Sequence, residues 1–257
     1  MISGFSDHQA AVAARVLDEE EAQRSHLVVS LSGAHAYGFP SPDSDLDLKA
    51  IHLEATTRLL GLSPPRVAAS RMELIDGVEI DYSSNEIGPV LVSILAGNGN
   101  YIERVTGAPS LRRTAEIDSL VPVVARSLSR RIHRHYRGFA TSQREEFERG
   151  PATAKRVLYV LRTTLTGTHA LLTGAVVTDL TLLCDDYGLA DARALVETKR
   201  AGERVVLDEQ ARVYWQRKLD SAFAMLDDAA ARSILPEAPT NSGEVEDWLV
   251  TLRRGRL

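Results

Sequence analysis

Two aspartates separated by a single residue, Asp45 and Asp47, are the first candidates for chemistry in the chain. Charged and apolar residues alternate around them, so a strand would place both carboxylates on one face. Two close carboxylates repel each other and shift each other's pKa unless a cation lies between them. Because hard oxygen ligands suit Mg²⁺, the pair predicts a site for a divalent cation, Mg²⁺ or Mn²⁺.

The turn at Gly33 supplies the second half of this chemistry. A strand that ends in a small-residue turn and opens a helix places backbone N–H groups where a phosphate could bind. Asp81, on the corresponding face of a later strand, could supply a third carboxylate. A phosphate-binding turn beside a carboxylate metal site is the equipment for phosphoryl or nucleotidyl transfer.

The strands that must position these residues can be predicted from short apolar or alternating runs. Such runs cover 26–32 and 46–53, and Asp76-Gly77 predicts a hairpin between 71–75 and 78–82. In the last of these segments Asp81 and Glu79 share one face, opposite the apolar residues. We therefore expect the three aspartates to lie on strands.

The helices follow from a longer period and from breaker residues. Ser6 and Gln9 have the spacing of a capping box, and Ser83 with Glu86 predicts the start of another helix near Glu86. Beyond about residue 115 no further strand is expected, and Gly and Pro residues separate the candidate helices. These are predicted at 119–138, 151–173, 178–187, 189–200, 208–231 and 242–254. A small α/β half therefore precedes a helical half, with the boundary near 112–118.

Composition excludes several classes of protein. The 257 residues are 44% hydrophobic and 25% charged, which is too apolar for a disordered chain. Cys184 is the single cysteine, so we expect no disulfide, a core position for this thiol and a reducing cytoplasm. The seven histidines show no zinc pattern. No apolar run reaches the length of a membrane span and no signal peptide is evident, so a cytoplasmic protein without a membrane partner is expected.

The stretch 31–49, LSGAHAYGFPSPDSDLDLK, resembles the signature of the DNA polymerase β-like nucleotidyltransferase superfamily. Its longer form, with Ala36-Tyr37-Gly38 and Ser44-Asp45-Leu46-Asp47, is similar to a group of bacterial nucleotidyltransferases associated with RNA ligases. The likeness extends in order over roughly residues 25–175. It includes Asp81, Glu86, the segment 97–103 that ends in Glu103, and a helical segment with Lys155, Tyr159 and Arg162.

This resemblance implies an α+β fold and an enzymatic activity. A nucleotidyltransferase domain over residues 1–114, with a small mixed sheet flanked by helices, would precede an all-helical domain over 115–257. The enzyme would move an NMP from an NTP to an acceptor hydroxyl and release pyrophosphate. Asp45, Asp47 and Asp81 would be catalytic and hold the metal, and Asp81 would also help to activate the acceptor.

The resemblance also implies a set of nucleotide-binding residues. They are Ser32, Gly33, Ala34, Tyr37, Ser44, Lys155 and Arg162. Two positions depart from the family pattern, since Ala34 replaces a serine that helps to hold a phosphate and Gly99 replaces a proline. The backbone N–H of Ala34 is retained, so the turn keeps a phosphate donor.

Each candidate also has a plainer interpretation. The aspartates could lie on solvated strand faces, and Lys155, Tyr159 and Arg162 have the spacing of an ordinary solvated helix face. The run 130–137, RRIHRHYR, could contact a nucleic-acid backbone, although a solvated helix face is the commoner explanation.

The acceptor is not readable from the sequence. An RNA 3′ end is the first hypothesis, because of the resemblance and of the basic run. A protein side chain or a small-molecule hydroxyl is the alternative, since the formal net charge is −5. A degenerate module that binds nucleotide or RNA without turnover is a further alternative, which Ala34 supports. The oligomeric state is not readable either.

Overall fold

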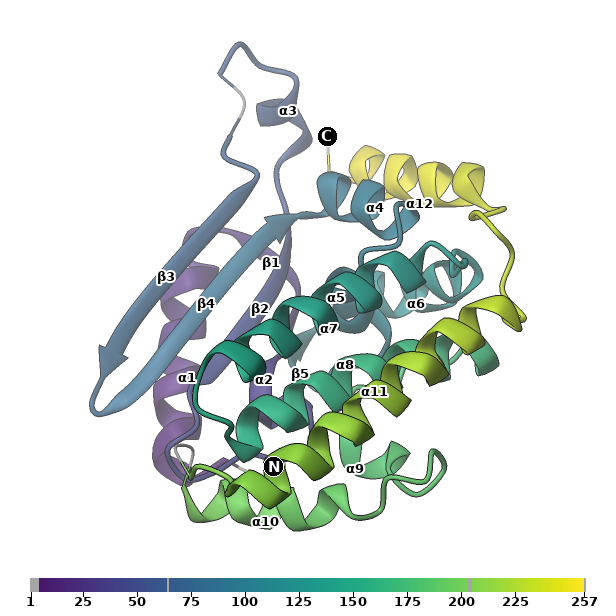
Figure 1. Cartoon of the computed structure of the whole chain (residues 1–257). Helices are drawn as coiled ribbons and strands as arrows, with labels where there is room; N and C mark the ends of the chain where they lie inside the picture. The colour runs from purple at the N-terminus through teal and green to yellow at the C-terminus, as the bar shows by residue number, and fades with distance from the viewer. Residues whose placement is uncertain (1–4, 64, 203–204, 257) are drawn as a thin grey trace.

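The computed structural model describes residues 5–63, 65–202 and 205–256. Within these residues, five strands form one mixed sheet with the order β3-β4-β2-β1-β5 (Figure 1). Strands β2 and β4 are parallel, and the other neighbours are antiparallel. The strands are β1 (Ser25–Leu31), β2 (Leu46–Leu53), β3 (Ala68–Ile75), β4 (Val78–Glu86) and β5 (Ser110–Arg113). The expected α+β class is thus confirmed.

The hairpin between β3 and β4 forms where the Asp-Gly pair predicted it. Asp76 and Gly77 have φ values of 50° and 82°, and positive φ at both central residues is what a type I′ hairpin turn requires. Val78, Ile80 and Tyr82 of β4 are buried on one face. Asp81 therefore lies on the opposite face, as the alternation predicted.

Helices cover the two faces of the sheet unequally. Helix α1 (Asp7–Glu21) begins with the predicted Ser6–Gln9 capping box and packs on the apolar face of β2 and β4. It lies behind the sheet in the view of Figure 1. On the other face, helices α4 (Ile87–Leu95), α5 (Gly99–Thr106) and α6 (Ala115–Arg126) bury Ile51 and Leu53 at the end of β2. The part of β2 that carries Asp47 is left partly exposed.

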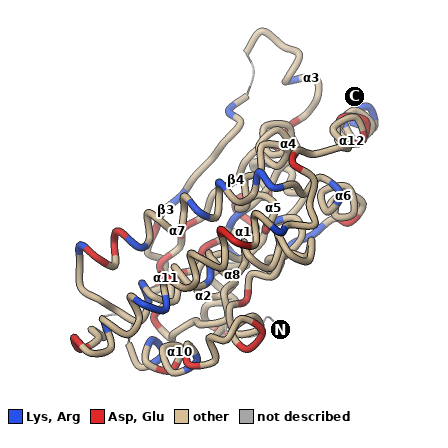
Figure 2. The backbone as a smooth tube through the Cα atoms, turned by 45° about the vertical axis from the view of Figure 1, so that its right-hand side comes forward, with Lys and Arg blue, Asp and Glu red and all other residues tan. Residues whose placement is uncertain are grey.

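The second half of the chain is helical in the described residues. Helix α8 (Ala154–Thr173) is largely buried between α7 (Ile132–Arg149) and α11 (Glu209–Ala231). The remaining elements are α2 (Gly33–Ala36), α3 (Thr56–Leu59), α9 (Leu180–Leu183), α10 (Ala192–Ala201) and α12 (Ser242–Arg254). Residues of both charge signs are interspersed along the backbone (Figure 2).

Two sequence predictions about helices were wrong. The single helix expected over 119–138 is divided, because α6 ends at Arg126 and α7 begins at Ile132. Buried Leu128 lies in the break, where the Arg130 N–H donates to the Pro236 carbonyl at 2.8 Å. The packing of this turn against a distant segment therefore overrides the helical period.

The second wrong prediction concerns the cap before α4. Ser83 does not cap a helix, because it pairs with Lys49 inside the parallel β2–β4 ladder. Glu86 is the N-cap, and its carboxylate accepts from the Gly88 N–H at 2.7 Å. The other Glu86 oxygen accepts from Arg253 of α12 at 2.9 Å. One strand missed by the sequence prediction, β5, has only four residues and is half-buried at the sheet edge.

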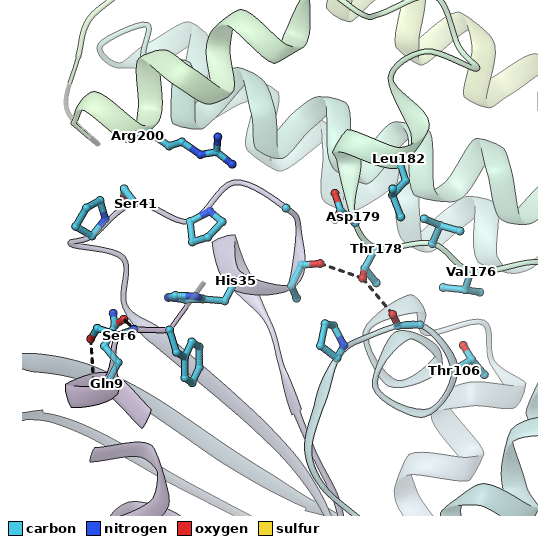
Figure 3. A pocket seen from close by; sticks show the side chains of 18 residues that line it. Ser6, Gln9, His35, Ser41, Thr106, Val176, Thr178, Asp179, Leu182 and Arg200 are labelled. Atoms are coloured by element: carbon cyan, nitrogen blue, oxygen red, sulfur yellow. Dashed lines mark hydrogen bonds between the residues drawn. The ribbon is translucent and has the colours of Figure 1, made fainter. Parts of the chain in front are cut away.

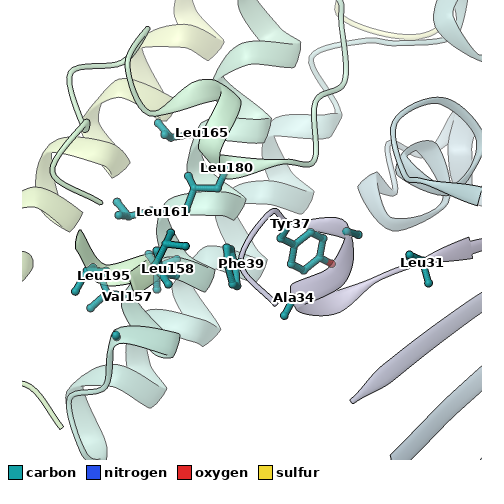
Figure 4. Packing of buried hydrophobic residues seen from close by; sticks show 14 of the residues in the cluster. Leu31, Ala34, Tyr37, Phe39, Val157, Leu158, Leu161, Leu165, Leu180 and Leu195 are labelled. Atoms are coloured by element: carbon teal, nitrogen blue, oxygen red, sulfur yellow. The ribbon is translucent and has the colours of Figure 1, made fainter. Parts of the chain in front are cut away.

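The core joins the two halves of the chain. One apolar cluster includes Leu46 and Leu48 of β2 together with Leu158 and Leu161 of α8. Figure 4 shows Leu158 of this cluster beside Phe39. Cys184 is buried in this cluster, as predicted, and burial raises the pKa of its thiol to about 11. The division at residue 114 falls between β5 and α6, and two separate domains stay a prediction. None of the described helices could span a membrane.

Candidate active site

The turn that follows β1 has the shape expected of the motif. Gly33 has a φ of +59°, in the left-handed region that favours glycine. A Cβ atom added to Gly33 would lie 1.9 Å from Asp47 Oδ2. The Ser32 N–H donates to the Asp47 backbone carbonyl at 2.9 Å. The predicted turn and one predicted carboxylate are therefore in direct contact, and a side chain at residue 33 would displace that carboxylate.

Asp47 and Asp81 lie side by side as register partners of parallel strands β2 and β4. A cationic group lies between them. Lys49 Nζ is 2.8 Å from Asp81 Oδ1 and 3.7 Å from Asp47 Oδ1, and it also donates to the Asp81 carbonyl at 3.2 Å. One ammonium group thus lies between two neighbouring carboxylates and neutralises only part of their charge.

The electrostatics of Asp47 depend on that cation. Burial raises the pKa of the Asp47 carboxyl to about 6; Lys49 opposes this shift, and the charges of Asp81 and Asp45 add to it. A second cation near this carboxylate would favour its charged form. The carboxylates of this site therefore carry more negative charge than the Lys49 ammonium neutralises.

Asp45 does not lie on a strand as expected, although its charge acts on Asp47. It is exposed and lies one residue before β2 begins. In the described part of the chain, no group of three or more His, Cys, Asp or Glu side chains is arranged to hold a metal ion. The donor set nevertheless fits a hard cation, because Asp47 and Asp81 already bind the Lys49 ammonium through carboxylate oxygens. Asp45 as a third ligand stays a prediction.

A buried polar network supports the far side of the turn. The guanidinium carbon of Arg162 lies 3.6 Å from the centre of the Tyr37 ring, and Arg162 forms an ion pair with Glu103. Tyr136 donates to Glu103 at 3.0 Å, and the hydroxyls of Tyr37 and Ser32 share a hydrogen bond of 3.1 Å. The network thus connects α8, α5 and α7 to the residue that precedes Gly33.

Arg162 is therefore not on the solvated face that its spacing also allowed. Its side chain is only 2% exposed. Tyr159, one turn earlier on α8, packs edge-on against Tyr37 and Phe39 with ring centres 5.8 Å and 5.6 Å apart. Lys155 and Tyr159 line a cavity of about 760 Å³ together with Phe139 and Gln143. Lys155 and Tyr159 therefore lie on a cavity wall, whereas Arg162 lies in the protein interior.

The other predicted nucleotide-binding residues are buried around the turn. Ala34 packs in the apolar cluster beside Tyr37 and Phe39 (Figure 4). The Ser44 hydroxyl is 2.9 Å from that of Ser41 and accepts from Lys199 at 3.0 Å. Lys199 therefore connects α10 to the loop that precedes Asp45.

The sequence analysis missed two cationic residues of this region. Lys49 lies two residues after Asp47, so the period of two placed it on the same side of the strand. Arg104 of α5 donates to Asn85 at 3.1 Å, and Asn85 lies on the Asp81 face of β4. Burial lowers the pKa of Arg104, and the charge of Asp81 is among those that oppose this shift. No local signal identified Arg104, because its partner lies 19 residues away.

Several residues of the basic run 130–137 make contacts within the chain. Arg137 and His133 bind Asp227 of α11, at 3.0 Å and 2.9 Å. Arg130 and Arg131 donate to the carbonyls of residues 235 and 95. His135 fits against Gly99, where an added Cβ would lie 2.5 Å from the His135 ring. This contact explains the glycine that replaces the family's proline.

A separate cavity of about 1190 Å³ lies beside the turn (Figure 3). His35 of α2, Thr178 and Asp179 of the loop before α9, and Arg200 of α10 line it. The described residues that line it include none of the three candidate aspartates. This cavity is therefore distinct from the carboxylate pair.

Comparisons with known proteins identify a family whose model matches most of the chain. The model of a family described as the RNA repair pathway DNA polymerase beta family matches residues 10–251. Among solved structures, a nucleotidyltransferase-like protein from Exiguobacterium sibiricum 255-15 is similar. It shares 11% sequence identity, the match covers 96% of this chain and 80% of that chain, and the TM-score is 0.34. The comparison with curated proteins finds no match.

Proposed function

The chain belongs to the RNA repair pathway DNA polymerase beta family, and from this premise we propose that this nucleotidyltransferase transfers an NMP from an NTP to an acceptor hydroxyl. The acceptor oxygen forms a bond to the α-phosphorus, the bond between the α-phosphorus and the bridging oxygen to the β-phosphate breaks, and pyrophosphate leaves. The observation that carries the proposal is the contact between the Gly33 turn and Asp47, whose register partner is Asp81.

The roles of the residues follow from their chemistry. Asp45 and Asp47 would hold a divalent cation, Mg²⁺ or Mn²⁺, with Asp81 beside them. When bound, such an ion supplies charge stabilisation to phosphoryl oxygens and favours deprotonation of a hydroxyl. Asp81, the more exposed carboxylate of the pair, would orient the acceptor hydroxyl and accept its proton. The backbone N–H groups of Gly33 and Ala34 would donate to phosphate oxygens.

Other residues would bind the nucleotide or support the turn. Lys155 and Tyr159 would contact the nucleotide from the wall of their cavity. Arg162 would act from the interior through Tyr37, and Ser32 and Ser44 would fix the ends of the motif loop. Arg104 would add positive charge beside the Asp81 face.

The proposed acceptor is the 3′ end of an RNA, in keeping with the name of the family. The test uses the full chain with Mg²⁺ or Mn²⁺ and each NTP labelled at the α-phosphate. Acceptors are an RNA oligonucleotide with a 3′ hydroxyl, the same RNA with a 3′ phosphate, a protein mixture and small-molecule alcohols. We expect label on the 3′-hydroxyl RNA and release of pyrophosphate.

The matched RNA with a 3′ phosphate separates transfer from simple binding, because it lacks only the attacking hydroxyl. If the label appears on protein or on an alcohol, the acceptor belongs to that class and is not RNA. Nucleotide binding without transfer to any acceptor would contradict the proposed reaction.

A further inference from the structure

The position of Lys49 carries an inference about how a cation reaches the carboxylate pair. Lys49 and Asp47 are two residues apart on one face of β2, and Asp81 is across the ladder on β4. The Lys49 ammonium contacts both carboxylates and the Asp81 carbonyl. Its side chain is only 13% exposed. This ammonium thus occupies the space between the two carboxylates.

We propose that Lys49 is a resident counter-cation of the site, which holds Asp47 and Asp81 together in the free protein and competes with a divalent ion for their oxygens. The inference rests on the proposed function, because that function assigns the divalent ion to these carboxylates. The chain would therefore bind a free divalent ion weakly. The ion would bind best together with a nucleotide, whose phosphates supply further oxygen ligands.

The chemistry of the ammonium supports this exchange. A lysine head is a compact charge on a flexible four-carbon stem, so it can leave one oxygen partner for another without movement of the strand. A nucleotide brings phosphate oxygens that can accept the released ammonium. The Asp81 carboxylate is 41% exposed, which leaves its outer side open to an arriving ion. Lys49 would thus pass from the carboxylates to the phosphates as the nucleotide binds.

The test measures Mn²⁺ affinity of the full chain without nucleotide, by calorimetry and by the electron paramagnetic resonance signal of free Mn²⁺. The variants are Lys49→Met and Lys49→Gln, and the glutamine can retain a hydrogen bond to the Asp81 carbonyl. A neighbouring charge changes the proton affinity of a carboxylate by roughly 10- to 1,000-fold. We therefore expect both variants to bind Mn²⁺ roughly tenfold or more tightly than the parent.

The matched control is Lys218→Met, which removes the same charge from a lysine paired with Asp191 in the helical half. Its Mn²⁺ affinity should equal that of the parent. A further readout is the gain in Mn²⁺ affinity on addition of a non-hydrolysable nucleotide, which should be larger for the parent than for the Lys49 variants. Circular dichroism and urea unfolding establish that each variant is folded.

Unchanged or weaker Mn²⁺ binding by both Lys49 variants would overturn the inference. The Asp45→Asn/Asp47→Asn variant shows which claim has failed. If that variant loses Mn²⁺ binding while the Lys49 variants behave like the parent, the proposed metal site stands and the role of Lys49 is wrong. If that variant still binds Mn²⁺ as tightly as the parent, the ion binds elsewhere, and the metal site and the role of Lys49 are both wrong.

Discussion

Two ion pairs flank the same turn and differ in their access to solvent. On the sheet face, Lys49 binds Asp47 and Asp81, whose side chains are 25% and 41% exposed. In the interior, the Arg162 and Glu103 side chains are 2% and 6% exposed, and Tyr136 and Tyr37 complete their surroundings. The difference teaches that the carboxylates of the sheet face remain open to solvent while their ammonium partner is largely covered, whereas both partners of the interior pair are enclosed.

The comparison predicts the largest loss of stability at the enclosed pair. Arg162→Met would leave the Glu103 carboxylate buried without its cation, which costs about 3–5 kcal/mol. Urea unfolding measures this change. The matched control is Arg149→Met, which removes an exposed partner of Glu145 and should cost about 0–1 kcal/mol.

Restoration by a second substitution would sharpen this result. Arg162→Met combined with Glu103→Gln removes both charges, so it should recover part of the loss. A cost below about 1 kcal/mol for Arg162→Met alone would mean that the interior pair does not support the fold, since that is the range of a surface pair.

Acid should weaken the enclosed region through His135. Burial lowers the pKa of His135 to about 4, and the charge of Arg162 adds to this effect. An unfolded histidine binds a proton near pH 6.5, so the unfolded state holds more protons between pH 6.5 and 4. The free energy of unfolding should therefore fall by about 1–3 kcal/mol as the pH drops through this window.

His135→Gln is the control for this pH dependence, because glutamine has no charge to gain. Thermal unfolding at pH 7.5 and at pH 4.5 should show a smaller difference for the variant than for the parent. Identical differences in both proteins would exclude His135 as the source.

Substitution of Gly33 should lower both the stability of the fold and the affinity for nucleotide. Gly33→Ala places a Cβ against Asp47 Oδ2. The alanine must also keep the left-handed φ of residue 33, and that conformation alone costs about 1–2 kcal/mol. We expect this loss in urea unfolding and weaker binding of a Mg²⁺-nucleotide in calorimetry. Gly77→Ala is the control for the backbone effect, since its φ is also positive but an added Cβ there meets nothing within 4 Å.

If Gly33→Ala loses stability and keeps the parent's nucleotide affinity, phosphates do not bind at this turn. Equal nucleotide affinity in the parent, Gly33→Ala and Gly77→Ala would lead to the same conclusion.

The smallest effect is expected at Ala34. A serine there would add the hydroxyl typical of the family, and a hydrogen bond to a charged group contributes about 1.5–3 kcal/mol. Ala34 is only 5% exposed within an apolar cluster, so part of this gain is offset by burial of the hydroxyl. Calorimetry with a non-hydrolysable nucleotide should show Ala34→Ser binding up to about tenfold more tightly. Weaker binding would mean that the hydroxyl cannot reach a phosphate.

Much of the sheet could be predicted from local sequence. The limits of β2 match the predicted segment 46–53, because a polar loop precedes the alternating residues 46–50 and apolar residues continue to Leu53. The hairpin followed from Asp76-Gly77, and the period of two gave the polar face of each strand that carries Asp47 or Asp81, but not the parallel pairing of the two strands. These features depend on residues that are close in the chain or on simple strand geometry.

What could not be predicted depends on distant partners. Arg162 has the spacing of a surface residue, and its burial is set by Glu103, which lies 59 residues away. Ser83 had a capping pattern, but pairing with Lys49 on β2 keeps it in a strand. The roles of Asp45, Asp47 and Asp81 in catalysis stay predictions, which a transfer measurement tests.

The central claim is that nucleotidyl transfer occurs at the carboxylate face beside the Gly33 turn. The most direct measurement is single-turnover transfer of an α-labelled NMP by the parent and by Asp45→Asn/Asp47→Asn, with urea unfolding as the control for folding. The account predicts that the variant folds and that its transfer rate falls roughly a thousandfold or more, equivalent to about 4 kcal/mol of barrier. A folded variant that transfers label at the parent's rate would contradict it.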